Sequence, residues 1–445
     1  MAQLRPPPGS TGLPFIGEAL SFLKDPFTFQ AEKTKRHGLV WKTKILGSTV
    51  VFFNGPRAFT FFLDPENFTR EKGSPPHIRE LLHPDAVPFI DGERHRARKR
   101  LLLAAFTPEA LASYVPALET LVRRYLAAWE TRDEQRLNPE LGQLAFDMAN
   151  LLFAAADPDV SDTKNAADFE TMIKGTFAPP VKLPFTAYGK ALAARDRLRA
   201  YIKEAVATRG GDGTALGALK AARGPDGEAL TREELEIELL HFFFAAHGGI
   251  TAVFAWLLVI FGQRPDVLAR VKAEVDALPP GPLTLERLGG LRYTAAVGRE
   301  LRRVYPIAPG TFFGVAKKDL EYEGHRIAKG WTAVGAIWTT LQDGATFADP
   351  ARLDPDRMAD EAFAALPENA YVPQGGGPRE GHRCPGEVLV DLVLPLFAAA
   401  FVRGHAIELP AQDLTPGAGG LGPLPKDGLR ARVRAVATTP QFKSA

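Results

Sequence analysis

The segment "YVPQGGGPREGHRCPGE", residues Tyr371–Glu387, contains Cys384, the only cysteine among 445 residues. Its three consecutive glycines predict a loop whose backbone can pass close to a flat ligand. The residues that follow predict a helix beginning near Pro385, so the cysteine lies at a helix N-terminus, where amide donors and the helix dipole stabilise a thiolate. Pro385 has no N–H, and these donors therefore start at Gly386. A lone cysteine can be a small buried side chain, a reactive thiol or a metal ligand, and the other segments have to distinguish these roles.

This loop resembles the heme-binding loop of the cytochrome P-450 superfamily, in which a cysteine thiolate is the axial ligand of the heme iron. The resemblance implies that Cys384 binds the iron of heme b. The other loop residues that it places at the heme are Gln374, Gly377, Arg379, His382 and Gly386. In most members the arginine lies two residues before the cysteine, whereas Arg379 lies five before it and His382 takes the nearer place. Gln374 also replaces an aromatic residue. Both departures resemble the bacterial fatty-acid peroxygenase branch.

Two upstream segments resemble the supporting motifs of the family, Glu-x-x-Arg and Phe-x-Pro-x-Arg-Phe. "ELRRVYP" contains Glu300 and Arg303, which project from one helix face, and "LDPDRM" contains Arg357. A Glu-x-x-Arg pair alone is common and usually forms a surface contact worth roughly a few tenths of a kcal/mol. Its place ahead of the cysteine loop favours the family motif instead. The resemblance implies a buried network of these three residues that supports the loop and takes no part in catalysis.

The stretch "DGERHRARKRLLLAAF", Asp91–Phe106, is rich in basic residues and on its own would be a solvated helix face. His95 and Lys99 are four residues apart and share one side of the predicted helix. Members of the family place a histidine or tryptophan and a basic residue here, on the heme propionates. The resemblance implies this role for His95 and Lys99, with Arg100 as a further candidate. The remaining arginines, such as Arg98, are expected to face a docking electron donor.

The stretch "LLHFFFAAHGGITAVFAWLLVIFG", Leu239–Gly262, is the most apolar part of the chain. It is long enough to cross a bilayer, for which about 20 residues suffice. However, it continues a helix that begins in water, because Thr231 and Glu234 have the spacing of a capping box. We therefore expect a helix buried in protein and no transmembrane anchor. By resemblance, this helix crosses the distal face of the heme.

The family pattern on the distal helix is Ala-Gly-x-acid-Thr, in which the acid and the hydroxyl relay protons to the bound oxidant. Ala245 and His247 fit this pattern, but Gly248 and Gly249 stand where the acid and the threonine should be. Thr251 lies two residues further, about 200° around the helix, and should not simply substitute for them. The resemblance places these five residues at the distal oxygen site. Three proton sources stay open: water held near the glycines or organised by His247, a group of the substrate, or a reaction that needs no dioxygen.

Two further stretches resemble the retinoid-type hydroxylases and their cyanobacterial relatives. They are "PGSTGLPFIGEALSFLKDPFTF" near the start and residues Leu183–Ile202. Together with Phe242, Phe243 and Phe244, they favour a large apolar substrate of terpenoid, carotenoid or retinoid kind, and a role in lipid metabolism. The Arg-Pro pair with which the peroxygenases hold a fatty-acid carboxylate is missing from "FFFAAHGG".

The resemblance therefore predicts a heme-thiolate monooxygenase that hydroxylates a lipophilic small molecule. Its electrons would come from a separate ferredoxin- or flavodoxin-type protein, because the chain leaves no room for a fused reductase. Fatty-acid hydroxylation driven by hydrogen peroxide is the second hypothesis. A heme-binding sensor and a rearrangement enzyme are further alternatives.

Length and composition narrow the remaining properties. Length alone would suggest about three domains, but no long linker or repeat divides the chain, and we expect a single domain over residues 1–445. Most apolar positions recur at helical spacing, as in Pro108–Glu130 and Arg264–Leu278, and strand-like pieces occur only near the start and after residue 320. This pattern predicts a mainly α fold with a small β region. A net charge of +2 argues against nucleic-acid binding. The N-terminus lacks an apolar signal core, so we expect a cytoplasmic protein. We also expect a monomer.

Overall fold

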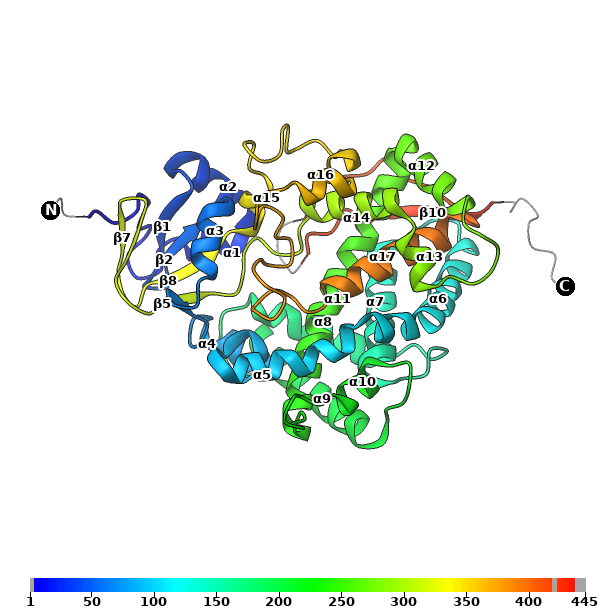
Figure 1. Ribbon diagram of the computed structural model, residues 1–445, viewed down its shortest axis with the longest axis horizontal. Helices are drawn as coiled ribbons and strands as arrows, with labels where there is room; N and C mark the ends of the chain where they lie inside the picture. Colours follow the sequence, from blue (N-terminus) through cyan, green and yellow to red (C-terminus); the bar gives the residue numbers. More distant parts are fainter. Residues whose placement is uncertain (1–3, 418–421, 437–445) are drawn as a thin grey trace.

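The computed structural model describes residues 4–417 and 422–436 and is mainly helical with small sheets, as the sequence predicts (Figure 1). The α-helices are α1 (Ala19–Lys24), α2 (Pro26–His37), α3 (Pro56–Leu63), α4 (Pro76–Leu82), α5 (Gly92–Leu102), α6 (Pro108–Glu130), α7 (Leu137–Ala154), α8 (Thr163–Thr176), α9 (Ala187–Thr208), α10 (Ala215–Ala221), α11 (Arg232–Gln263), α12 (Pro265–Asp276), α13 (Leu285–Gly289), α14 (Arg292–Val304), α15 (Ile337–Leu341), α16 (Asp360–Ala364) and α17 (Glu387–Val402). Short 3₁₀ helices are η1 (Val87–Phe89), η2 (Leu103–Phe106) and η3 (Pro355–Met358). The predicted span of one domain, 1–445, also includes residues 1–3, 418–421 and 437–445, which lie outside the described residues.

The strands belong to three small sheets. They are β1 (Val40–Ile45), β2 (Ser48–Phe53), β3 (Phe68–Thr69), β4 (Gln135–Arg136), β5 (Gly314–Ala316), β6 (Leu320–Tyr322), β7 (His325–Ile327), β8 (Thr332–Gly335), β9 (His405–Glu408) and β10 (Arg430–Ala435). The five-stranded sheet has the order β1-β2-β8-β5-β3. Its parallel β2–β8 pair joins the N-terminal hairpin to residues 332–335, and Trp41 stacks on Phe52 with ring centroids 4.2 Å apart. Figure 1 shows this sheet, in blue and yellow, beside the helical part of the molecule.

Helix α11 runs through the helical part and forms its core (Figure 1). The capping box at its start is present, because the Thr231 side chain accepts from the Glu234 N–H and the Glu234 carboxylate accepts from the Thr231 N–H. By length and composition α11 could span a membrane, but 83% of its apolar window is buried inside the protein. The helix is therefore a core helix. Helices α6 and α12 reproduce the two other predicted helical stretches closely.

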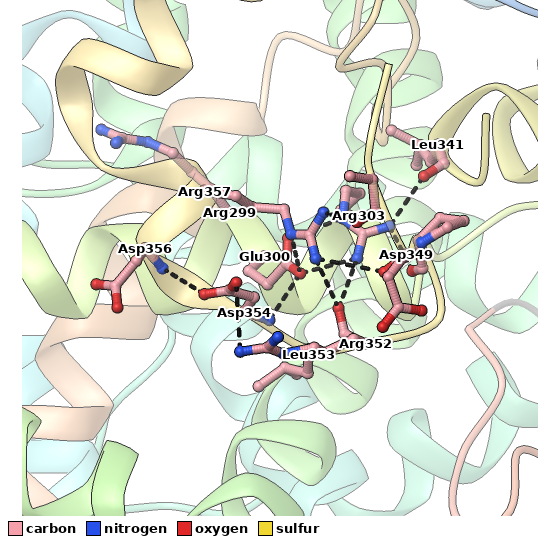
Figure 2. Close-up of polar contacts among 12 residues, drawn as sticks. Arg299, Glu300, Arg303, Leu341, Asp349, Arg352, Leu353, Asp354, Asp356 and Arg357 are labelled. Carbon is pink, nitrogen blue, oxygen red and sulfur yellow. Dashed lines mark hydrogen bonds and ion pairs between the residues drawn. The ribbon is translucent and has the colours of Figure 1, made fainter. Parts of the chain in front are cut away.

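The predicted network of Glu300, Arg303 and Arg357 is confirmed and lies buried between α14 and η3 (Figure 2). Glu300 and Arg303 are fully buried, and the guanidinium makes two hydrogen bonds to the carboxylate, 2.7 and 2.8 Å long. Arg357 Nε lies 3.3 Å from the same carboxylate. Arg303 also donates to the carbonyl oxygens of Leu341 and Pro350, so the network ties α14 to the chain that leads into the cysteine loop.

Candidate functional site

The cysteine loop is a tight turn structure ahead of α17. The Cys384 N–H donates to the Gln374 carbonyl oxygen at 3.1 Å, which closes the loop on itself. Gly375 and Gly377 have φ values of 86° and 79°, in the left-handed region that favours glycine. A Cβ atom on Gly376 would lie 2.5 Å from the side-chain oxygen of Asn369. The glycines are therefore required by the local path of the backbone.

The environment of Cys384 suits a metal-bound sulfur. Burial raises the pKa of its thiol, while the charge of Lys99 and the N–H of Gly386 act in the opposite direction without overcoming burial. The side chain nevertheless keeps some exposure. A bound metal cation deprotonates a coordinating thiol outright, so a cation at the sulfur would offset the effect of burial and hold Cys384 as a thiolate.

Helix α5 brings its basic residues onto this loop. Lys99 is buried, and its Nζ donates to the Arg383 carbonyl oxygen at 2.5 Å. The His95 ring lies against the His382 ring, with centroids 4.1 Å apart. Burial, helped by nearby positive charge, lowers the pKa of His95 to about 3, so its imidazole is neutral at pH 7. His382 is in turn 3.0 Å from a carboxylate oxygen of Asp91 at the start of α5. The structure thus brings His95, Lys99 and His382 together.

Two side chains of the loop keep buried donors without a partner among the described residues. Arg379 donates through one terminal nitrogen to the Phe106 carbonyl oxygen at 2.8 Å, but its Nε has no acceptor in the part of the chain that the structure describes. The amide nitrogen of Gln374 is also buried and has no acceptor among the described residues. Buried donors of this kind require acceptors, and the carboxylates of a heme would supply them beside Arg379. Arg100 is placed apart from these residues, half-exposed and 3.6 Å from Glu228.

Arg98 corrects one expectation from the sequence. It does not face a docking partner, because its side chain is only 3% exposed and pairs with two carboxylates of α11. One terminal nitrogen lies 2.9 Å from Glu238, and the other contacts Glu234. The basic side chains of this stretch therefore face three environments: Arg98 contacts α11, Lys99 contacts the cysteine loop and Arg100 is partly in solvent.

The middle of α11 faces an open space on one side. Ala245 is exposed and Ala246 half-exposed, although the neighbouring turns of the helix are buried. On the same side, the Phe242 ring packs against the Phe106 ring at 5.6 Å between centroids. The Phe106 ring borders Gly386, where an added Cβ would lie 3.9 Å from the ring and 3.8 Å from Cys384 Sγ. The space next to Ala245 therefore lies between α11 and the cysteine loop, which is where a heme bound to Cys384 would lie.

The other residues predicted at the distal site are distributed around α11. Gly249 faces Ile307, whose side chain would lie 3.1 Å from an added Cβ, and the carbonyl oxygen of Gly248 borders Gly422. His247 points toward α7, where a Cβ on Gly142 would lie 3.8 Å from its Nε2. Burial lowers the pKa of His247. The Thr251 hydroxyl donates to the His247 carbonyl oxygen at 2.5 Å. The structure thus places Ala245 beside the open space, Gly249 against Ile307, and His247 and Thr251 elsewhere on the helix.

Comparison with known proteins decides the family. A model of the family described as Cytochrome P450 matches residues 7–418. The chain belongs to the cytochrome P450 family. It is 34% identical over 442 residues to putative cytochrome P450 120 of Synechocystis sp., covering 97% of each chain. It is also 30% identical to abscisic acid 8'-hydroxylase 2 of Oryza sativa subsp. indica, covering 97% of this chain and 87% of the relative.

Solved cytochrome P450 structures agree in fold. Retinoic acid bound cyanobacterial CYP120A1 superposes with a TM-score of 0.89 at 32% identity, covering 98% of this chain and 100% of the other. A mutant of cytochrome P450SP alpha (CYP152B1) superposes with a TM-score of 0.80 at 26% identity, covering 94% and 99%. As a cytochrome P450, the protein is a monooxygenase whose heme b is held by a cysteine thiolate, and Cys384 is the only cysteine that can supply it.

Two polar residues near the site were not selected from the sequence. Glu238 and His241 lie on α11, one to two turns before Ala245, and both are buried. Their spacing of three residues inside an apolar stretch could have identified them, because polar side chains buried in a core helix need partners.

Proposed function

We propose that this cytochrome P450 hydroxylates a large apolar molecule of terpenoid, carotenoid or retinoid kind. The observation that carries the proposal is the open space between α11 and the cysteine loop, whose walls include Ala245, Phe242 and Phe106. Apolar walls bind a lipophilic substrate by removing its surface from water. The retinoic acid bound to CYP120A1 and the abscisic acid of the rice hydroxylase support a substrate of this class.

In this proposal, the side chains around the loop bind and orient the heme. Cys384 holds the iron, and Lys99 and Arg379 direct positive charge and hydrogen-bond donors to its carboxylates. His95 is neutral and packs against His382, so these rings act as hydrogen-bonding and packing groups. Bound heme supplies the oxygen-transfer chemistry at a C–H bond. Ala245 and Gly249 leave room on the distal side for the oxidant.

A separate electron donor fits the outer side of the cysteine loop. A cavity of about 320 Å³ opens there between α14, α17 and the loop. Its lining contains four arginines and two acids, which are Arg292, Arg299, Arg302, Arg383, Glu387 and Asp391. Each arginine has a carboxylate partner, since Arg302 and Arg383 pair with the two lining acids and Arg292 and Arg299 share Asp360, so a small excess of positive charge is left. This excess suits an acidic ferredoxin- or flavodoxin-type protein, because complementary charge speeds association.

Hydrogen peroxide is the alternative oxidant, and one observation favours it. Gly248 and Gly249 carry no acid or hydroxyl at the positions that relay protons in most members of the family. Peroxide brings its own protons and needs no electron donor, and in the peroxygenase branch the substrate carboxylate assists the reaction. The fatty-acid hydroxylase is therefore the second candidate. It assigns no role to the arginine-lined cavity, because peroxide needs no electron donor.

One preparation separates the two candidates. The purified protein is reduced under carbon monoxide to record its spectrum, and retinoic acid and fatty acids are titrated into the ferric form to follow the spin-state change. Turnover is then measured with ferredoxin and its reductase, and separately with hydrogen peroxide. We expect a thiolate-type spectrum, tight binding of the retinoid and hydroxylation with ferredoxin.

Two outcomes would contradict the proposal. Selective turnover of fatty acids with peroxide would establish the second candidate instead. An unchanged spectrum in Cys384→Ala would remove the axial assignment on which both depend.

A further inference from the structure

Helix α11 contains an unusual buried pair, Glu238 and His241. Glu238 is 0% exposed, and one of its carboxylate oxygens accepts from Arg98 at 2.9 Å and from the Val87 N–H at 2.9 Å. Its other oxygen lies 3.8 Å from His241 Nδ1. Neither of these two atoms has a hydrogen-bond partner within residues 4–417 and 422–436. Because unmade hydrogen bonds in a core are costly, the pair calls for an explanation other than packing.

The pair lies on the side of α11 that faces the heme space. At 100° per residue, Glu238 is within about 20° of the direction of Ala245 and His241 within about 40°. His241 precedes Ala245 by one turn, about 6 Å along the axis. His247, by contrast, lies about 200° from Ala245 and contacts α7. Of the two histidines on α11, His241 is thus the one directed toward the reaction space.

The charges around His241 favour a proton donor over an anion-binding group. Glu234 and Glu238 lie on its own helix, Arg98 and Lys99 on the adjacent α5, and His83 and Asp85 after α4. Arg98 lies between Glu234 and Glu238 and offsets part of their negative charge. The other oxygen of Glu238 faces His241 Nδ1 at 3.8 Å, where it can orient the ring. The same carboxylates repel an anionic substrate group, so His241 is poorly placed to hold one.

We propose that His241, positioned by Glu238, donates the distal proton that the missing acid and threonine at Gly248 and Gly249 would otherwise relay. The imidazolium gives one proton to the oxygen that leaves as water and recovers one proton from solvent water. No electrons move in this step, since the donor protein or hydrogen peroxide provides them. Glu238 is a positioning residue, because its carboxylate faces Nδ1 of His241 and can orient the ring. This inference rests on the proposed heme-thiolate hydroxylase.

The test compares four variants of the heme-loaded protein. His241→Gln removes the proton donor, Glu238→Gln removes the negative charge but keeps the hydrogen bonds to Arg98 and Val87, and His247→Gln changes the histidine on the opposite side. His405→Gln is the matched control. His405 lies on β9, away from the site, and forms a pair with Glu130 at 3.1 Å. The measurements are product formed per electron pair consumed as a function of pH, and the rate of cyanide binding to the ferric heme.

The expected results follow from the loss or retention of the proton-donating ring of His241. His241→Gln lowers the yield of product at least tenfold and changes its pH profile, while Glu238→Gln keeps the ring and lowers the yield less. At alkaline pH an imidazole is neutral and can accept the proton that hydrogen cyanide loses on binding, so cyanide binding measured there becomes several-fold slower in His241→Gln. His405→Gln retains the wild-type values. If Glu238→Gln does not fold, His241→Gln alone decides.

Two results would overturn the inference. One is a His241→Gln protein with the wild-type pH profile and cyanide rate, and the other is the expected change in His247→Gln instead. Failure of the proposed function is distinguishable, because the wild-type protein would then lack the thiolate spectrum or any turnover.

Discussion

At the scale of single residues, Glu300 shows how a charge is kept inside the protein beneath the cysteine loop. Its carboxylate receives two hydrogen bonds from Arg303 and one from the Asp354 N–H at 2.9 Å, with Arg357 beside it (Figure 2). A buried ion pair of this kind is stable only when nearly every donor and lone pair is used. Arg303 also donates to the carbonyl oxygens of Leu341 and Pro350, in the segment that leads to the cysteine loop. Loss of the network should therefore shift the loop.

Replacing Glu300 by glutamine tests this dependence. The variant leaves the Arg303 guanidinium buried without its counter-charge, which should lower the free energy of unfolding by about 3–5 kcal/mol. Heme should be lost at a lower temperature, and thermal unfolding followed at the heme absorbance measures both effects. Glu93→Gln is the matched control, because Glu93 and Arg96 have the same spacing on α5 but are exposed, and such a pair is worth at most about 1 kcal/mol. Equal effects of the two substitutions would contradict the structural role of Glu300.

The same scale shows what could not be predicted from residue type. The spacing of Glu300 and Arg303 predicted that they share a helix face, and the family resemblance added that their pair is buried and includes Arg357. Arg98 has no such local signal, since its carboxylate partners Glu234 and Glu238 are 136 and 140 residues away in the sequence. A buried arginine and a solvated one look alike in the sequence until the helices are packed.

At the scale of elements, α11 combines a polar start, a polar side toward α5 and an apolar body. Its capping box fixes the first turn, and the remaining turns are held by packing against α7, α14 and α17. His247 lies inside this packing against α7, with the Phe146 ring 6.4 Å away between centroids. Burial lowers the pKa of His247, and its neutral ring is part of the core.

This placement predicts a pH-dependent stability. The unfolded chain binds a proton at His247 below about pH 6.5, whereas the folded protein resists doing so because the pKa is lowered. The stability contribution of His247 is therefore present above pH 6.5 and is lost as the pH falls, by up to about 1.4 kcal/mol per pH unit. Between pH 7.5 and 5.5, the melting temperature of the wild type should fall more than that of His247→Gln. Parallel curves for the two proteins would show that the ring is protonated when folded.

The elements differ in how well the sequence predicts them. The helical period and capping signals gave α6 with both ends, Pro108 and Glu130, because these signals are local. The strands were predicted only as regions, since β8 finds its partner β2 nearly 300 residues away and no local pattern encodes that pairing. The cysteine loop was predictable because its glycines are needed by backbone geometry, while the directions of His247 and Thr251 depend on how α11 is rotated.

At the scale of the whole molecule, α11 and the cysteine loop separate two chemical environments. The side toward α11 is apolar and suits the substrate, and the outer side of the loop carries the arginine-lined cavity. Arg302 is buried there and pairs with Asp391, and the charge of that carboxylate raises the pKa of its guanidinium despite burial. In the proposed function, electrons would arrive from the outer side of the loop while the substrate is bound on the side of α11.

Charge reversal at the rim of the cavity tests the proposed donor side. Arg292 is well exposed at this rim, with 73% of its side chain accessible, so Arg292→Glu should disturb docking more than folding. We expect reduction of the heme by ferredoxin, followed as formation of the carbon monoxide complex, to become several-fold slower and less sensitive to salt. Reduction by dithionite should be nearly unchanged. Arg57→Glu supplies the matched control, since Arg57 is 89% exposed on α3, near the sheet. Equal slowing by both substitutions would indicate a general effect of net charge and exclude this face as the donor site.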